Sequence, residues 1–211
     1  MSRIVVFGVT GYAGGHIGAE LLERGHTVVG AARDTTQVPA REGLELRRGS
    51  LYDPVFRTKT VKGADVVVVA LPAHPADGPD LETAVAGLLE AVTGARLGVV
   101  GGAASLLATE GGPLVLDTLA EDYKPEAEAH ARVLDALRRS GTTVDWFYLS
   151  PALGFGSWNA GEKTGTFRLG TDVLVTDANG DSEISGADYA IAFVDEIEKP
   201  AHHQSRFTIG Y

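Results

Sequence analysis

Three glycines spaced three residues apart form the pattern in this chain that points most directly to chemistry. Gly8, Gly11 and Gly14 follow an apolar run at residues 4–7 and precede a helical pattern at residues 17–24. Glycine accepts a positive φ and, lacking a Cβ, lets a phosphate approach the backbone. The N–H groups at the start of the following helix would face that phosphate. The other residues expected in this phosphate-binding turn are Thr10, Tyr12 and Ala13.

The elements that must hold this turn alternate along the chain. Apolar runs typical of buried strands lie at residues 4–7, 27–32, 44–46, 65–71, 97–100 and 144–149. Helical patterns lie between them at residues 17–24, 81–92 and 121–140. This alternation predicts an α/β fold in which a doubly wound parallel sheet is covered by helices on both faces.

The pattern changes after Pro151, where Gly, Asn and Thr become frequent. Short strands are expected at residues 167–169, 173–176 and 207–209, a hairpin turn at residues 179–180 and a helix at residues 185–198. We expect one domain over residues 1–211. Within it, residues 152–211 would contribute a small substrate lobe at the carboxyl edge of the sheet, where open α/β sheets bind ligands.

Composition excludes several classes of function. A net charge of −10 argues against nucleic acid as the main partner, because phosphate backbones require a basic surface. The absence of cysteine excludes disulfides and thiolate chemistry, and we expect no metal site. No apolar stretch is long enough for a membrane span, and the first strand begins too early to leave room for a signal peptide. We therefore expect a cytoplasmic protein with no membrane partner, as a monomer or homodimer.

The end of the second strand indicates which dinucleotide is bound. An NAD site usually has Asp or Glu there, which accepts a hydrogen bond from the ribose 2′-hydroxyl. Residues 30–32 are small and neutral, and Arg33 follows, with a planar guanidinium that suits a 2′-phosphate. NADP is therefore expected. Two alternatives stay open: Arg33 is a solvated residue paired with Asp34, or Asp34 itself serves NAD.

Two further segments are expected beside the cofactor. Ser50 and Leu51 follow the third strand, where the adenine edge would lie, although an ordinary turn is an equally good interpretation. Residues Ala70, Leu71 and Pro72 end the fourth strand and should pack beneath the ribose.

Motifs over nearly the whole chain carry a family resemblance. They are the glycine turn, Arg33 and residues 101–106, 117–127, 148–151, 161–170 and 206–211. The chain resembles the atypical short-chain dehydrogenases, and among them the NAD(P)H-binding group labelled NADH-flavin reductases, which is related to NmrA-like proteins and to biliverdin reductase B. The resemblance implies a Rossmann-type fold, a nicotinamide cofactor and cofactor contacts at Gly101, Gly102 and Pro151.

Two departures limit the chemistry that the resemblance implies. Many short-chain dehydrogenases use Tyr-x-x-x-Lys, in which the ammonium group lowers the pKa of the tyrosine. No tyrosine of this chain has lysine four residues later, which disfavours alcohol or ketone chemistry by that device. The biliverdin reductase relative has a histidine near the position after Pro151, where this chain has Ala152. That difference weakens the transfer of its substrate.

Hydride transfer to a flavin or quinone needs little beyond stacking the acceptor on the nicotinamide. Ser105 is the candidate polar group near the nicotinamide, with a turn cap as its alternative, and Tyr123 is either a group at the pocket mouth or a surface aromatic. His74 lies on the loop after the fourth strand and ranks above the helical His130, which we interpret as structural. The expected aromatic wall, or alternatively the core of the lobe, consists of Phe155, Trp158 and Phe167.

These residues predict an NADPH-dependent oxidoreductase that transfers a hydride to a planar small-molecule acceptor such as a flavin or quinone. The alternative is a non-catalytic NADP(H)-sensing regulatory protein of the NmrA kind. An epimerase or dehydratase of nucleotide sugars is disfavoured by the small lobe and the missing Tyr/Lys pair.

Overall fold

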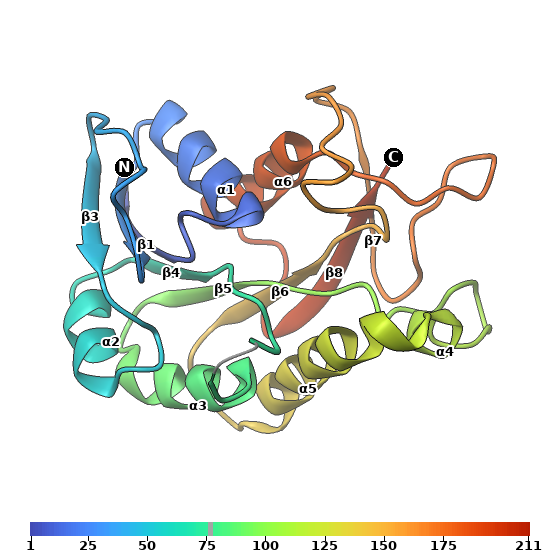
Figure 1. The fold of residues 1–211 in the computed structure, drawn as a ribbon, viewed down its shortest axis with the longest axis horizontal. Helices are drawn as coiled ribbons and strands as arrows, with labels where there is room; N and C mark the ends of the chain where they lie inside the picture. Colours follow the sequence, from blue (N-terminus) through green and yellow to red (C-terminus); the bar gives the residue numbers. More distant parts are fainter. Residues whose placement is uncertain (76–77) are drawn as a thin grey trace.

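A single sheet of eight strands lies at the centre of the protein (Figure 1), in a computed structural model that describes residues 1–75 and 78–211. The strand order is β3-β2-β1-β4-β5-β6-β8-β7, and only β7, at one edge, runs antiparallel to its neighbour. The strands are β1 (Arg3–Phe7), β2 (Thr27–Ala32), β3 (Leu44–Arg48), β4 (Val66–Val69), β5 (Arg96–Val100), β6 (Trp146–Ser150), β7 (Arg168–Gly170) and β8 (Ser205–Gly210).

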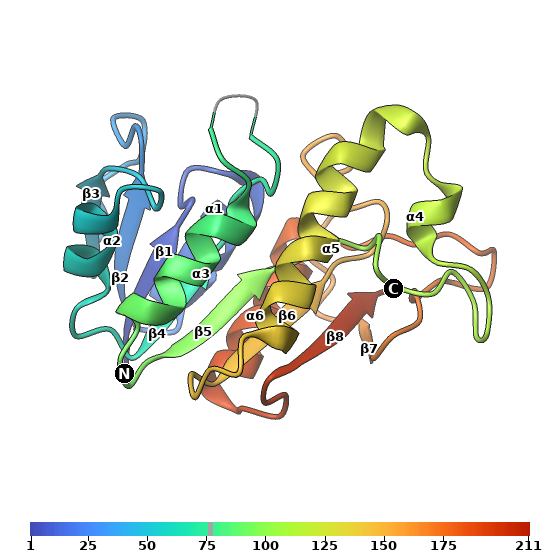
Figure 2. The same ribbon diagram turned by 90° about the horizontal axis from the view of Figure 1, so that it is seen from below.

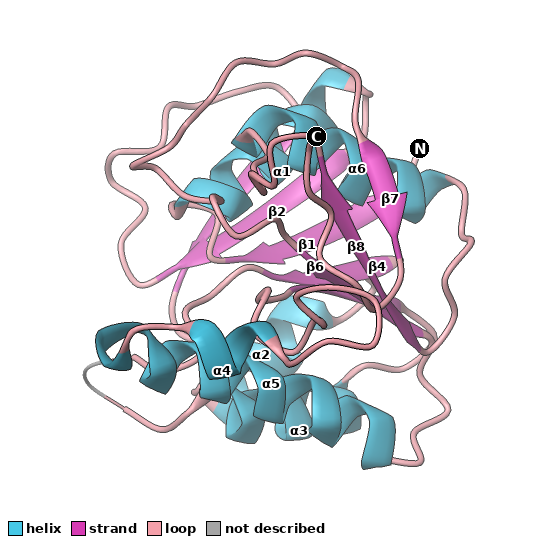
Figure 3. Cartoon of the chain, turned by 90° about the vertical axis from the view of Figure 1, so that its right-hand side faces the viewer, coloured by secondary structure: helices cyan, strands magenta, loops and turns pink. Residues whose placement is uncertain are grey.

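Helices cover both faces of the sheet, as the alternating sequence pattern predicts. One face packs against α1 and α6, and the other against α2, α3 and α5 (Figures 2 and 3). Side chains of β1 alternate between the two cores, with Val5 facing one layer and Val6 the other. The helices are α1 (Tyr12–Glu23), α2 (Pro54–Val61), α3 (Leu81–Ala91), α4 (Val115–Thr118), the 3₁₀ turn η1 (Glu121–Tyr123), α5 (Lys124–Arg139) and α6 (Gly186–Glu198).

The strand order reverses at β1, and this reversal creates the crevice in which a ligand can bind. From β1 the chain moves outward to β2 and β3, then returns to β4 on the other side. Phe7 at the end of β1 is in register with Ala31 of β2 and Val69 of β4. The loops that follow these three strands therefore emerge at one level of the carboxyl edge and diverge to opposite faces.

Local sequence explains where the structure differs from the expected elements. α1 begins at Tyr12, five residues earlier than predicted, because Gly11 is already its N-cap residue. α2 was not expected, although its signals are present. Asp53 accepts hydrogen bonds from two N–H groups of the first turn, and Pro54 occupies the first helical position. The prediction of a strand at residues 173–176 is wrong, because only Val173 of this segment forms a bridge, with Leu107.

The C-terminal third contributes to the sheet as well as to its carboxyl edge. β8 inserts between β6 and β7, and α6 packs along α1. The intervening loops run over the carboxyl end of the sheet (Figure 3). Asp188 of α6, fully buried, accepts hydrogen bonds from Thr164, Gly165 and the hydroxyl of Tyr211 at 2.7–2.8 Å. This carboxylate joins the loop of residues 161–166 to α6 and the chain terminus.

Candidate cofactor and substrate site

Two cavities open side by side at the carboxyl edge of the sheet. The first has a volume of about 500 Å³ and lies among the ends of β1, β2, β3 and β4. The second has a volume of about 770 Å³ and lies among the ends of β4, β5 and β6. They share Gly11 and residues Ala70, Leu71 and Pro72. The two cavities therefore form a continuous trough across the switch point, with the start of α1 at its middle.

The cofactor residues expected from the sequence are distributed between the two cavities, with one exception. The first cavity is lined by Gly8, Thr10, Gly11, Arg33, Ser50 and Leu51, and the second by Tyr12, Ala13, Gly101, Gly102 and Pro151. Gly14 lines neither, because it is buried against the backbone of the turn.

The three glycines of the turn have different physical roles. Gly8 has a φ of +92°, and a Cβ there would lie 2.1 Å from the carbonyl oxygen of Ala70. A Cβ on Gly14 would lie 2.1 Å from the carbonyl oxygen of Gly8. Gly11 has an ordinary φ of −80°, and a Cβ there would meet the oxygen of Gly8 only at 3.3 Å. Packing thus requires the outer two glycines, whereas Gly11 mainly leaves space where the cavities meet.

That open space lies at the N-terminus of a twelve-residue helix. Gly11 provides no side chain to cap α1, and the first backbone bond of the helix runs from Gly15 N to Gly11 O. The N–H groups of Tyr12 and Ala13 precede this first bond and lie beside the second cavity. The residues present therefore fit a dinucleotide pyrophosphate, because free N–H groups, the helix dipole and a missing Cβ coincide.

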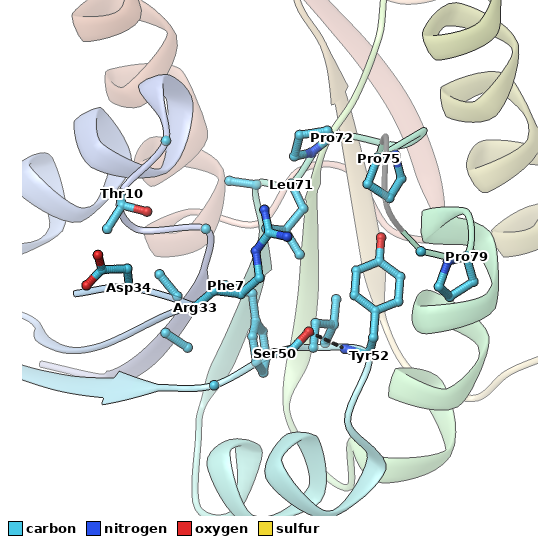
Figure 4. A pocket seen from close by; sticks show the side chains of 18 residues that line it. Phe7, Thr10, Arg33, Asp34, Ser50, Tyr52, Leu71, Pro72, Pro75 and Pro79 are labelled. Atoms are coloured by element: carbon cyan, nitrogen blue, oxygen red, sulfur yellow. Dashed lines mark hydrogen bonds between the residues drawn. The ribbon is translucent and has the colours of Figure 1, made fainter.

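Arg33 projects into the first cavity without a partner. Its guanidinium points towards Leu71, and within residues 1–75 and 78–211 it makes no hydrogen bond or ion pair (Figure 4). Asp34 is instead bonded to the N–H and hydroxyl of Thr36 at 3.0 and 2.8 Å, and these bonds lower the pKa of its carboxyl. The Nε of Arg48 donates to the carbonyl oxygen of Arg33 at 3.1 Å. The cavity thus presents an available cation, and the alternative Arg33–Asp34 pair does not form.

Tyr52 completes the first cavity and was not expected there. Its ring points into the space between Leu71 and the prolines at positions 75 and 79 (Figure 4). Its hydroxyl oxygen is enclosed and lacks a hydrogen-bond partner in the described part of the chain. Burial raises the pKa of this hydroxyl, with Asp80 and Glu126 contributing in the same direction. The N–H of Tyr52 donates to the Ser50 hydroxyl at 3.2 Å, so Ser50 also shapes the turn.

The second cavity is lined mainly by apolar side chains. Its lining includes Val100 at the end of β5, Ala104 in the loop that follows, and Phe155. Trp158 and Tyr123 lie at its mouth with 78% and 68% of their surface exposed. The Trp158 indole packs over Gly156, where a Cβ would approach it to 2.0 Å. A planar apolar surface is thus exposed beside the cavity.

Tyr12 connects the turn to the wall of the second cavity. Its hydroxyl accepts the N–H of Gly186 at 2.9 Å and donates to the carbonyl oxygen of Ala160 at 3.2 Å. Its ring meets that of Phe155 edge-on, with centroids 5.3 Å apart. The first residue of α1 therefore fixes the segment that carries the aromatic wall.

Three residues expected near the chemistry lie outside both cavities. The Ser105 hydroxyl is 3.3 Å from a guanidinium nitrogen of Arg206 and lines neither cavity. His74 is half exposed, and its imidazole pairs with Asp80 at 2.7 Å. Phe167 packs against the core beside α6. Of the remaining candidates, Tyr123, Phe155 and Trp158 line the second cavity.

The structure brings Glu126 and His130 to the second cavity, although His130 was interpreted as structural. They are four residues apart on α5, and His130 Nε2 lies 3.2 Å from Glu126 Oε1. Their i,i+4 spacing near the start of a helix that follows β5 was the available signal. The sequence pattern alone did not show that the loop after β4 would meet this helix face.

The fold and the trough together define a Rossmann-type dinucleotide-binding domain, the class implied by the resemblance described above. A model of the NAD(P)H-binding family matches residues 8–200, and the chain belongs to that family. The uncharacterised Bacillus subtilis protein YwnB is 34% identical over 213 residues, covering 98% of this chain and 97% of YwnB.

Solved structures agree with this assignment. A proposed NADH-flavin reductase from Streptococcus pneumoniae is 32% identical, with a TM-score of 0.85 over 100% of this chain and 99% of that one. A proposed epimerase from Bacteroides thetaiotaomicron is 31% identical, with a TM-score of 0.89 over 100% of this chain and 97% of that one. None of the helices that the structure describes combines the length and apolar character required of a membrane span.

Proposed function

We propose that the protein binds NADPH along the trough and reduces a planar acceptor, such as a flavin or quinone, in the second cavity. The observation that carries this proposal is the division of the trough at Gly11. One side ends at an available guanidinium, and the other is an apolar cavity with an exposed indole at its mouth. The first side suits the adenosine and its 2′-phosphate, and the second suits the nicotinamide and a planar acceptor.

Named residues would hold the cofactor, and the cofactor carries the redox chemistry. The start of α1 would bind the pyrophosphate, Arg33 the 2′-phosphate, and Gly101, Gly102 and Pro151 the nicotinamide end. When bound, the dihydronicotinamide supplies a hydride. The mainly apolar lining of the second cavity suits a planar ring, and Phe155 and Trp158 would orient the acceptor by stacking.

One experiment tests this proposal directly. NADPH oxidation is followed by absorbance with FMN, riboflavin and several quinones, and NADPH and NADH affinities are measured separately by fluorescence titration. We expect turnover with at least one planar acceptor. Tight NADPH binding without turnover of any of them would overturn the reductase.

A specific feature supports the second candidate, an NADP(H) sensor of the NmrA kind. Trp158, Tyr123 and Leu153 are exposed apolar residues around the mouth of the second cavity. Exposed apolar patches beside a ligand site are typical of protein interaction surfaces. In that case NADPH would bind, acceptors would not be reduced, and a protein partner would respond to the redox state of the nucleotide.

A further inference from the structure

Glu126 and His130 form a polar pair in an otherwise mainly apolar wall of the second cavity. The side chain of His130 is 13% exposed, and that of Glu126 is 44% exposed. Both residues line the cavity, and Nε2 of His130 lies 3.2 Å from Oε1 of Glu126. Hydride transfer between stacked rings does not require an ionisable pair of this kind. The pair therefore indicates a further chemical role for the second cavity.

The carboxylate of Glu126 is fixed by the backbone of the loop after β4. Oε1 accepts the N–H of Ala73 and Oε2 accepts the N–H of His74, both at 2.7 Å. Burial raises the pKa of this carboxyl, but the bonds from His130 and from these two N–H groups outweigh it and leave the pKa below its ordinary value. A fixed negative charge therefore stands beside Nε2 of His130.

The imidazole of His130 is held against the end of β5. A Cβ added to Gly102 would meet the His130 ring at 3.2 Å, so the ring lies over that glycine. Nδ1 is enclosed and without a partner among the described residues, whereas Nε2 contacts the Glu126 carboxylate at 3.2 Å. We infer that Nε2 is the nitrogen that exchanges a proton.

Tyr148 of β6 is a second ionisable group close to His130. Its hydroxyl donates to the His130 carbonyl oxygen and accepts the N–H of Gly102, each at 3.0 Å. Burial raises the pKa of this hydroxyl well above its usual range, although the Gly102 bond and the charges of Arg206 and Arg138 act in the opposite direction. Tyr148 is fully buried, its hydroxyl proton is donated to a backbone carbonyl oxygen, and it does not line the second cavity, so it is not the proton source.

We propose that His130, oriented by Glu126, is the proton donor of the second cavity, and that its partner is a carbonyl oxygen of a quinone-type acceptor. This inference rests on the proposed reductase function and narrows its substrate class. His130 is the catalytic residue in this scheme, and Glu126 is a positioning residue. The i,i+4 pair takes the place of the absent Tyr-x-x-x-Lys device.

The step balances in atoms and electrons. Reduction of a quinone to a hydroquinone takes two electrons and two protons. Both electrons and one hydrogen arrive as the hydride from the bound cofactor, which is left oxidised. The second proton passes to the carbonyl oxygen from Nε2 of His130 in its imidazolium form, so that an N–H bond breaks, an O–H bond forms and a neutral imidazole remains. Solvent at the open mouth returns the proton to His130.

A binding measurement without cofactor tests the proton site. Histidine labelled with ¹⁵N is observed by NMR while 4-nitrophenol, a phenolic probe that takes no hydride here, is added. We expect a saturable shift of the His130 signal, no shift of the exposed His203, and weaker probe binding in His130→Gln. An unshifted His130 signal, or equal binding by His130→Gln, would overturn the proposal.

Kinetics supply the second test. In His130→Gln we expect the kcat for menadione to fall about 100-fold, a loss in the range of general acid catalysis, while the dissociation constant of NADPH stays unchanged. His203→Gln, at the opposite edge of the sheet, is the matched control, and circular dichroism checks folding of both variants.

The outcomes separate the two proposals. If the wild-type protein reduces no acceptor, the reductase function fails, and the NMR result still decides whether His130 binds a phenolic oxygen. If the wild-type protein reduces menadione and His130→Gln does so equally fast, the reductase function is supported and the assignment of His130 as proton donor is refuted.

Discussion

Replacement of Arg33 by alanine gives the sharpest test of the first cavity. The guanidinium lacks a protein partner in the described residues, so its removal exposes no buried charge and should leave the fold intact. A hydrogen bond to a charged group contributes roughly 1.5–3 kcal/mol, and solvent exposure favours the lower end of that range. We therefore expect the dissociation constant of NADPH to rise about 10- to 30-fold, since about 1.4 kcal/mol corresponds to a factor of ten.

The assay is a fluorescence titration of wild type and variant with NADPH and with NADH. NADH lacks the 2′-phosphate, so its affinity should change by no more than about twofold. Arg139→Ala removes the same charge at the far end of α5 and serves as the control. Added salt should weaken NADPH binding more in wild type than in Arg33→Ala, because screening acts on the lost contact. Equal losses for NADPH and NADH would refute the assignment of Arg33 to the phosphate.

Three further predictions concern the turn, the acceptor and stability. Gly11→Val should abolish binding of NADPH and NADH in titrations, whereas Gly15→Ala, whose Cβ would have an ordinary 3.5 Å contact, should bind both; a Gly11→Val protein that binds normally would mean that the pyrophosphate lies elsewhere. Trp158→Ala should raise the KM for the acceptor several-fold with NADPH affinity unchanged, and the same KM would exclude stacking on this indole. Asp188→Asn should lower the free energy of unfolding by about 2 kcal/mol at neutral pH in urea titrations, because one carboxylate oxygen that accepts hydrogen bonds is lost. Burial raises the pKa of the Asp188 carboxyl, but its hydrogen bonds hold that pKa below the ordinary value. The stabilisation by the ionised carboxylate is therefore fully present above the ordinary pKa and disappears as pH falls through the lowered pKa. Equal stability of both proteins at neutral pH would contradict this prediction.

The sequence was sufficient to predict the parallel sheet and the carboxyl edge at which the trough lies, because both follow from the local pattern of apolar and glycine residues. Apolar runs bounded by glycine identify parallel strands, and ligands of such sheets bind at the carboxyl edge. Gly8 and Arg33, expected at the cofactor from their positions after β1 and β2, both line the first cavity. The sequence pattern could not show that packing requires Gly14 but not Gly11. That difference depends on how closely each glycine approaches a backbone carbonyl oxygen.

Side-chain partnerships from distant parts of the chain account for what sequence reasoning missed. The Ser105 hydroxyl contacts Arg206, 101 residues away, and Glu126 binds the N–H groups of a loop more than 50 residues before it. Neither contact has a local signature. His74 follows β4, a strand that ends at the trough, yet its imidazole pairs with Asp80. The helical His130, in contrast, lines the second cavity. Proximity in sequence to a strand end thus predicts backbone placement better than side-chain direction.

Tyr12 shows how the two halves of the site depend on each other. Its backbone belongs to the turn that would bind the pyrophosphate, while its hydroxyl holds Ala160 and Gly186. Its ring packs on Phe155. Trp158 lies in the sequence between Phe155 and Ala160, the two positions that Tyr12 contacts in this segment. Hydride transfer depends steeply on the separation and alignment of donor and acceptor. Because one residue joins the glycine turn to the aromatic wall, the fold would set the separation of donor and acceptor in the proposed reaction.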